Sequence, residues 1–236
     1  MSTQDPLPAE GSTVTTEVAL APVVHVVDDE ASIQDLFHQL GRLEHLEIRS
    51  YRCAAEFLRT AAEPRSSCLV LDLNLPDQSG LSVLEELSRR DSRPPVVFMS
   101  GMAKVSEAVH ALKHGSIDFV EKPFTIDAML AAIRRALQID DRQRQQQQGQ
   151  QALRQRFAAL TPREAEVMQL VVDGLPNKAM AARLGVSPKT IEVHRANVMR
   201  KTAAESLADL VRMAITMRDA GGQPAVAAGR SSHAIR

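Results

Sequence analysis

Aromatic residues are scarce in this chain of 236 residues, which contains no Trp, one Tyr and six Phe. Pockets for flat ligands are commonly lined by aromatic rings, and proteins that bind single-stranded nucleic acid stack bases on such rings. The composition therefore argues against both kinds of site.

Cysteines, signal sequences and long apolar runs are also rare or missing. The two cysteines, Cys53 and Cys68, have no partner histidines at metal-ligand spacing, which indicates small core residues in a reducing compartment. Residues 1–20 contain no Lys or Arg, so the basic start of a signal peptide is missing. No apolar run approaches the roughly 18 residues of a membrane helix. We therefore predict a cytoplasmic protein without a membrane partner.

The chain is long enough for about two domains. Between residues 21 and 137, apolar strand-like runs alternate with helical patterns five times. The strands are expected at 23–27, 46–51, 69–72, 95–99 and 117–120, and the helices at 31–42, 54–62, 81–91, 103–113 and 126–137. Such alternation predicts an α/β domain with a doubly wound, five-stranded parallel sheet.

The remaining segments have different compositions. Residues 1–20 are predicted to be a disordered leader, and residues 219–236 a flexible tail. Residues 138–157 form a Gln- and Arg-rich tract that cannot bury a core, so we expect a linker, partly helical and interrupted at Gly149. Residues 158–218 show only helical patterns, which predict an all-α domain of four helices at 162–173, 177–184, 188–201 and 205–217.

Polar side chains follow four of the predicted strands, at the points where these strands end. Asp28 and Asp29 follow the first strand, Asp72 the third, Ser100 the fourth and Lys122 the fifth. Functional groups of doubly wound sheets gather at this edge. Three converging carboxylates would repel one another, and a divalent cation with oxygen ligands, most naturally Mg²⁺, would relieve that repulsion. A carboxylate beside a metal, an amine and a hydroxyl suits transfer of a phosphoryl group onto Asp72.

Each of these residues also has a purely structural explanation. Residues 28–30 could cap the first helix, Ser100 could lie in a plain turn, and Lys122 could lie in a surface loop. Their joint placement at the strand ends favours a shared site.

An enzymatic alternative is a haloacid-dehalogenase-like phosphatase. Such an enzyme requires a second Asp two residues after the nucleophile, and this chain has Asn74 there, which argues against the phosphatase.

Residues 21–137 resemble the receiver domain of two-component response regulators, which has a CheY-like fold. The resemblance rests on the motifs VVDDE at 26–30, LDLNLP at 71–76 with Gly80, MSG at 99–101 and DFVEKPF at 118–124. It implies that Asp72 accepts the phosphoryl group and that Mg²⁺ is held by Asp28, Asp29, Asp72 and the backbone carbonyl of Asn74.

The same resemblance assigns three switch residues. Ser100 would be the switch hydroxyl, at a position where Thr is commoner, and Phe119 the aromatic side chain that rotates with it. Lys122 would bind the phosphoryl group, and the Lys122–Pro123 peptide bond would be cis.

Residues 158–218 have the outline of a helix-turn-helix. Thr161, Pro162 and Glu164 form a helix start, and Ser187 caps a further helix after only a short turn. Charge is also divided: residues 21–137 carry 17 acidic and 13 basic residues, a net charge of −4, whereas residues 138–220 carry 9 acidic and 13 basic, a net charge of +4. The alternative is a helical bundle with a solvated basic face.

The motifs LTPRE at 160–164, GLPNK at 174–178 and SPKTIEVHR at 187–195 resemble the LuxR-type helix-turn-helix. By this resemblance, helix 188–201 enters the major groove of double-stranded promoter DNA. The base-edge candidates are Glu192, Val193, Arg195 and Ala196. The phosphate candidates are Lys178, Lys189, Thr190, Arg200 and Lys201.

Over residues 21–218 the chain resembles FixJ/NarL-type regulators. This resemblance implies a transcription regulator and not an enzyme. The only chemical reactions it implies are Mg²⁺-dependent self-phosphorylation from a phosphodonor and autodephosphorylation. A sensor histidine kinase would phosphorylate Asp72, and the chain would then form a homodimer through helix 103–113, strand 117–120 and helix 126–137. RNA polymerase would be a further partner. The alternatives are a phosphate-independent interaction module, which the complete acidic set disfavours, and a ligand-sensing LuxR-type regulator, which the missing pocket aromatics disfavour.

Overall fold

The computed structural model describes residues 21–60, 63–90, 93–101 and 111–219. The chain divides into two compact units between Asp141 and Arg142. The leader predicted at 1–20, most of the helix predicted at 103–113 and the tail from residue 220 lie outside the described residues. None of the helices in the described ranges combines the length and apolar character that a membrane span requires.

The first unit is built on a parallel sheet with the strand order β2-β1-β3-β4-β5, which confirms the predicted five-stranded α/β fold. The strands are β1 (Val23–Val27), β2 (Glu47–Tyr51), β3 (Ser67–Asp72), β4 (Val96–Ser100) and β5 (Asp118–Glu121). Every residue of β1, β3 and β4 is buried, as expected for strands covered on both faces, whereas β2 and β5 lie at the edges and are more exposed.

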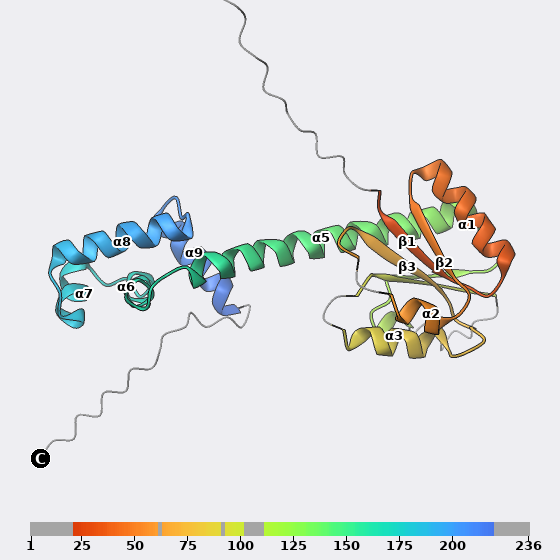
Figure 1. Cartoon of the computed structure of the whole chain (residues 1–236), viewed down its shortest axis with the longest axis horizontal. Coiled ribbons are helices and arrows are strands. Elements are labelled where there is room, and N and C mark those ends of the chain that lie inside the picture. Colours follow the sequence, from red (N-terminus) through yellow and green to blue (C-terminus); the bar gives the residue numbers. More distant parts are fainter. Residues whose placement is uncertain (1–20, 61–62, 91–92, 102–110, 220–236) are drawn as a thin grey trace, which may run out of the picture. The chain divides into compact units, whose positions relative to one another are not determined.

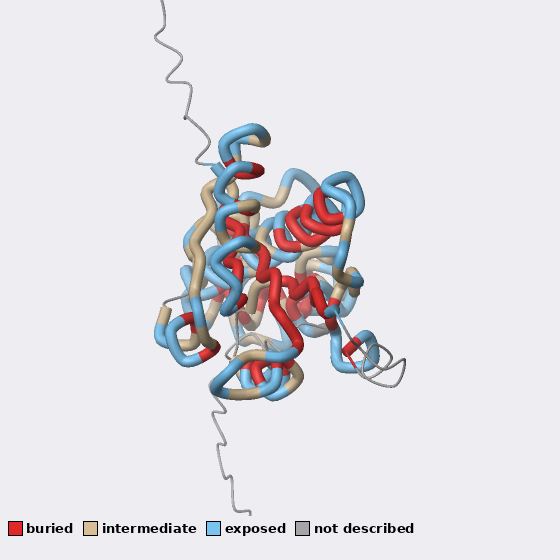
Figure 2. The backbone as a smooth tube through the Cα atoms, turned by 90° about the vertical axis from the view of Figure 1, so that its right-hand side faces the viewer, coloured by how far each residue is buried: buried red, intermediate tan, exposed pale blue. Residues whose placement is uncertain are grey.

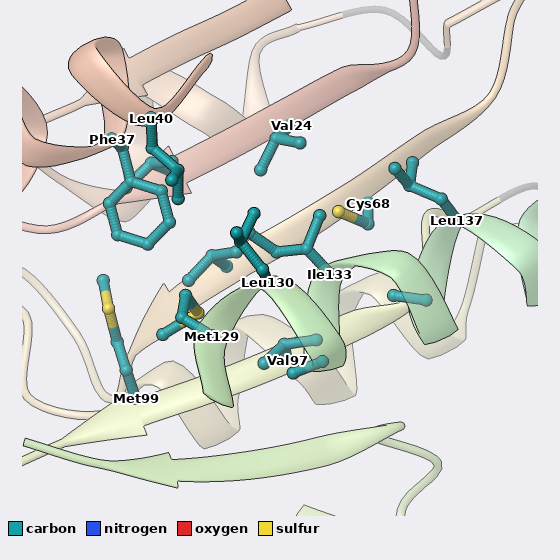
Figure 3. Packing of buried hydrophobic residues seen from close by; sticks show 14 residues of the cluster. Val24, Phe37, Leu40, Cys68, Val97, Met99, Met129, Leu130, Ile133 and Leu137 are labelled. Atoms are coloured by element: carbon teal, nitrogen blue, oxygen red, sulfur yellow. The ribbon is translucent and has the colours of Figure 1, made fainter. Parts of the chain in front are cut away.

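Helices cover both faces of this sheet (Figure 1). One face packs against α1 (Ala31–Glu44) and α5 (Ile126–Ala158), and the other against α2 (Ala54–Leu58) and α3 (Gly80–Ser88). Buried residues follow the central strands and the inward faces of these helices (Figure 2). Figure 3 shows Met129, Ile133 and Leu137 of α5 packed over Val24 and Val97 of the sheet.

Helix α5 is longer than the sequence predicted. It runs from Ile126 to Ala158 without a break, so the interruption predicted at Gly149 is wrong. A single glycine costs a helix only about 1 kcal/mol relative to Ala, and the surrounding Gln, Arg and Ala are good helix formers. Within this helix Asp140 is buried, and its Oδ2 atom accepts a hydrogen bond from the backbone N–H of Ser67 at 2.9 Å.

The second unit contains α6 (Pro162–Val172), α7 (Asn177–Leu184), α8 (Pro188–Thr202) and α9 (Leu207–Asp219), as the four helical patterns predicted. Its core includes Met168, Met180, Ile191 and Leu210, together with Phe157 from the end of α5. The predicted capping of α6 is confirmed, because Thr161 and Glu164 form a reciprocal capping box. Ser187 caps α8 and Gly185 ends α7 with a positive φ of 66°, which together make the short turn between these helices.

Candidate functional site

The polar residues predicted at the strand ends lie at one edge of the sheet. Asp28 directly follows β1, Asp72 is the last residue of β3, Ser100 is the last residue of β4, and Lys122 directly follows β5. Asp28 and Ser100 are fully buried, and Asp72 is only 6% exposed. Polar groups so deeply buried require partners to offset their loss of solvation.

Lys122 supplies the partner that two of these carboxylates need. Its Nζ atom donates to Asp28 Oδ2 at 2.7 Å, to Asp72 Oδ2 at 2.8 Å and to Glu30 Oε1 at 3.0 Å. Burial alone would lower the pKa of Lys122, but its hydrogen bonds to Asp28, Asp72 and Glu30 outweigh burial and raise that pKa. Lys122 is therefore a fixed positive charge beside Asp72.

The carboxylates of Asp28, Asp29 and Asp72 form a cluster that fits a hard divalent cation. Ligand atoms of these three residues all lie within 4.8 Å of one another. The backbone N–H of Glu30 donates to Asp28 Oδ1 at 2.8 Å, and that of Asn74 donates to Asp72 Oδ1 at 2.9 Å. Burial raises the pKa of Asp28, although its hydrogen bonds with Lys122 and with the backbone of Glu30 act in the opposite direction. An all-oxygen donor set of this kind suits Mg²⁺.

The capping explanation for residues 28–30 is not supported. Glu30 occupies the N-cap position of α1, but its side chain makes no capping hydrogen bond and contacts Lys122 instead. The remaining predicted residues lie nearby in the fold: Phe119 in β5 is half-buried against the apolar cluster under α3, and the Lys122–Pro123 peptide bond is cis.

One contact of the acceptor loop was not foreseen from the sequence. Asp77 accepts hydrogen bonds from the backbone N–H groups of Ala54 and Ala55, at 3.1 and 2.9 Å, so it caps α2 from a loop more than 20 residues away. The only signal in the sequence was that Cys53, a residue not preferred at an N-cap, precedes this helix, and in the structure its side chain makes no capping hydrogen bond. This contact ties the loop after Asp72 to a neighbouring helix.

A second candidate surface lies on α7 and α8 of the other unit. Several residues predicted to contact DNA are exposed on these two helices, and Val193 is exposed although it is apolar. Those that the structure exposes are Lys178, Lys189, Glu192, Val193, Ala196 and Arg200. Lys189 Nζ donates to Glu192 Oε2 at 2.9 Å within this exposed set.

Three other predicted residues of this surface are held by protein partners. Thr190 is half-buried and shares a hydrogen bond with Ser187. Arg195 is half-buried, and its guanidinium donates to Asn177 Oδ1 at 2.6 Å. Lys201, predicted to hold a phosphate, donates to buried Glu164 at 2.6 Å.

Comparison with known families assigns both units. Residues 24–134 match the response regulator receiver domain, and residues 158–214 match the bacterial regulatory proteins of the luxR family. The chain is 39% identical over 202 residues to Nodulation protein W of Bradyrhizobium diazoefficiens, covering 86% of this chain and 89% of that protein. It is 40% identical over 192 residues to the transcriptional regulatory protein FixJ of Azorhizobium caulinodans, covering 81% of this chain and 91% of that protein.

The chain is a two-component response regulator. Its first unit is the receiver domain and its second the LuxR-type DNA-binding domain, so this regulator acts on transcription and is not a catalytic enzyme. Solved structures agree: the response regulator StyR is 38% identical with a TM-score of 0.78, covering 83% of this chain and 99% of that one. Full-length FixJ from B. japonicum is 35% identical with a TM-score of 0.51, covering 82% and 95%.

Proposed function

We propose that phosphorylation of Asp72 controls DNA binding by this response regulator. The observation that supports this most directly is the contact of Lys122 Nζ with Asp72 Oδ2 at 2.8 Å, in a site that also gathers Asp28 and Asp29. A sensor histidine kinase in the cytoplasm is the proposed phosphodonor.

The residues around Asp72 fit a phosphoryl transfer. A carboxylate oxygen of Asp72 attacks phosphorus, a new oxygen–phosphorus bond forms, and the bond between phosphorus and its leaving group breaks. Mg²⁺, held by Asp28, Asp29, Asp72 and the carbonyl of Asn74, would neutralise the charge that develops on the phosphoryl oxygens. Lys122 then binds one of these oxygens, because the group adds about −1.5 to −2 charges.

The response to this charge would involve Ser100 and Phe119. The Ser100 hydroxyl turns towards the phosphoryl group, and Phe119 takes up the space that it vacates. This favours one of two arrangements of the face formed by the helix predicted at 103–113, β5 and the start of α5. The chain then pairs with a second copy through that face.

A dimer would place two copies of α8 in neighbouring major grooves of promoter DNA. RNA polymerase is the further partner proposed for the DNA-bound dimer. A dimer is favoured because the net charge of +4 over residues 138–220 gives one copy only a modest electrostatic attraction to DNA. The exposed residues Glu192, Val193 and Ala196 would face base edges, with Arg195 beside them. The proposed phosphate contacts are Lys178, Lys189, Thr190 and Arg200, and Lys201 if it leaves Glu164.

The test uses acetyl phosphate with Mg²⁺ and follows the intact mass of the full chain. The wild-type chain should gain one phosphoryl group, whereas the Asp72→Asn chain should gain none. Labelled and unlabelled wild-type chains are then compared for binding to duplexes enriched from a random-sequence library. Equal labelling of both chains would refute Asp72 as the acceptor, and equal DNA affinity of labelled and unlabelled wild-type chains would favour a phosphate-independent receiver.

A further inference from the structure

Among the residues that the structure describes, Glu30 is the one exposed carboxylate that contacts Lys122. Its Oε1 atom lies 3.0 Å from Lys122 Nζ, and its side chain is 56% exposed. The other two partners differ sharply, since the side chains of Asp28 and Asp72 are 0% and 9% exposed. Of the three contacts, the one with Glu30 is therefore the one that water and salt can weaken most.

The ammonium group of Lys122 has no donor to spare in this arrangement. A lysine ammonium carries three N–H donors, and Lys122 Nζ contacts three carboxylates at 2.7, 2.8 and 3.0 Å. A phosphoryl group on Asp72 would need at least one of these donors. The donor must come from one of the three existing contacts, and the Glu30 contact is the least buried.

Glu30 also affects the approach of a phosphodonor through its charge. Acyl phosphates and phosphohistidine are anions, and Lys122 is the cation nearest to Asp72 among the described contacts. A third carboxylate on Lys122 lowers the positive potential that would attract such a donor.

We propose that Glu30 is a positioning residue that restrains the receiver in its resting state. It holds Lys122 on the solvent side of the site and must release it before Lys122 can bind the phosphoryl group on Asp72. Glu30 thereby slows phosphorylation and sets a threshold for the incoming signal. This inference rests on the proposed role of Asp72 as acceptor.

The experiment compares the full-length wild-type chain with Glu30→Gln, which keeps the size of the side chain and removes its charge. Labelling by acetyl phosphate with Mg²⁺ is followed over time at several donor concentrations. Glu30→Gln should be phosphorylated about threefold to fivefold faster, the effect of losing one exposed ion pair, and should reach half-saturation at a lower donor concentration. This ratio of rates should shrink as ionic strength rises, because salt weakens the Glu30 contact in the wild-type chain.

The matched control is Glu121→Gln. Glu121 is also exposed and is the neighbour of Lys122 in the sequence, but no ion pair joins it to Lys122 among the described residues. This variant should keep the wild-type rate. A rate increase equal to that of Glu30→Gln would show a general charge effect and overturn the inference.

Mg²⁺ affinity, measured by calorimetric titration, separates restraint from metal binding. Glu30→Gln should bind Mg²⁺ as tightly as the wild-type chain, because Asp28, Asp29 and Asp72 are intact. Weaker Mg²⁺ binding together with slower labelling would instead show that Glu30 helps to bind the metal. Equal labelling rates for Glu30→Gln and the wild type would refute the restraint but leave Asp72 as the acceptor. If neither chain accepts label, the acceptor role of Asp72 fails and this inference fails with it.

Discussion

The carbonyl oxygen of Asp72 lies 2.5 Å from the position that a Cβ atom on Gly80 would occupy. The backbone N–H of Gly80 donates to the carbonyl of Leu73 at 2.9 Å, so the start of α3 is pressed against the end of β3. A side chain at position 80 would force the acceptor strand and its loop apart.

We therefore expect Gly80→Ala to lower the free energy of unfolding by about 1–3 kcal/mol, the usual range for overpacking. It should also slow the labelling of Asp72 by acetyl phosphate. Calorimetric unfolding and mass spectrometry measure the two effects. The control is Gly149→Ala in α5, where an added Cβ meets no atom within 4 Å and should stabilise the helix by about 0.5–1 kcal/mol. A Gly80→Ala chain as stable as the wild type would mean that the loop can relax freely.

Ser116 carries a buried hydroxyl without a hydrogen-bond partner among the described residues. An unsatisfied buried polar group costs about 1–3 kcal/mol, so Ser116→Ala should raise the free energy of unfolding by about 1 kcal/mol. Urea unfolding measures this change. Thr202→Val is the contrasting variant, because the Thr202 hydroxyl donates to the Val198 carbonyl at 2.8 Å and its removal should destabilise the chain.

His25 should make stability sensitive to acid. Burial lowers the pKa of His25 from 6.5 to about 4, so the unfolded chain binds a proton at this residue before the folded chain does. The resulting penalty is absent above pH 6.5 and grows as pH falls to about 4, where it reaches about 3 kcal/mol. His25→Gln should therefore lose less stability than the wild type between these pH values.

The partner of His25 provides the control. Tyr51→Phe removes the hydroxyl that lies 3.1 Å from His25 Nδ1 but leaves the residue buried. Because burial is the main cause of the lowered pKa, this variant should keep the wild-type loss of stability in acid. Equal pH profiles for His25→Gln and the wild type would contradict the assignment.

The ion pair between Lys201 and Glu164 tests the role of Lys201. The Glu164 side chain is only 5% exposed, so Lys201→Met should destabilise the DNA-binding domain by about 2 kcal/mol. The hydrogen bond from Lys201 lowers the pKa of Glu164, so this contribution is present above pH 4.5 and is lost as pH falls below that value. Calorimetry at neutral and acidic pH measures both effects.

Lys189→Met is the matched variant for Lys201→Met. The Lys189 side chain is 84% exposed, so its loss should change stability by less than about 0.5 kcal/mol. If Lys189 holds a phosphate, its loss should weaken binding to all duplexes and reduce the salt dependence of binding. A reduced salt dependence with Lys201→Met, without a loss of stability, would instead place Lys201 on the DNA.

The positions of Asp28, Asp72 and Lys122 could be predicted from the sequence because a short apolar run marks each of the three strands that they follow or end. Parallel strands bring those ends to one edge, so the site follows from topology. The partners of long side chains do not follow in this way. Glu30 and Lys201 could each have reached several groups, and only the folded chain shows which carboxylate or ammonium they meet.

The Gln-rich tract shows another limit of sequence reasoning. Composition predicts that residues 138–157 are a linker without a core of their own, but it does not reveal that α5 continues through them or that Phe157 at their end packs into the core of the second unit. Contacts across long separations are equally hidden, as with Asp77 and Ala54, which are 23 residues apart along the chain.

The bond from Ser67 to Asp140 bears on where the receiver can be excised. A fragment that stops at residue 137, the boundary predicted from the sequence, would lack Asp140 and leave the Ser67 N–H at the head of β3 buried without its acceptor. The part of α5 that contains Asp140 and binds the start of β3 thus lies within the Gln- and Arg-rich tract at residues 138–157. Isolated receivers should therefore be cut after residue 141, and shorter fragments should show faster hydrogen exchange at the start of β3.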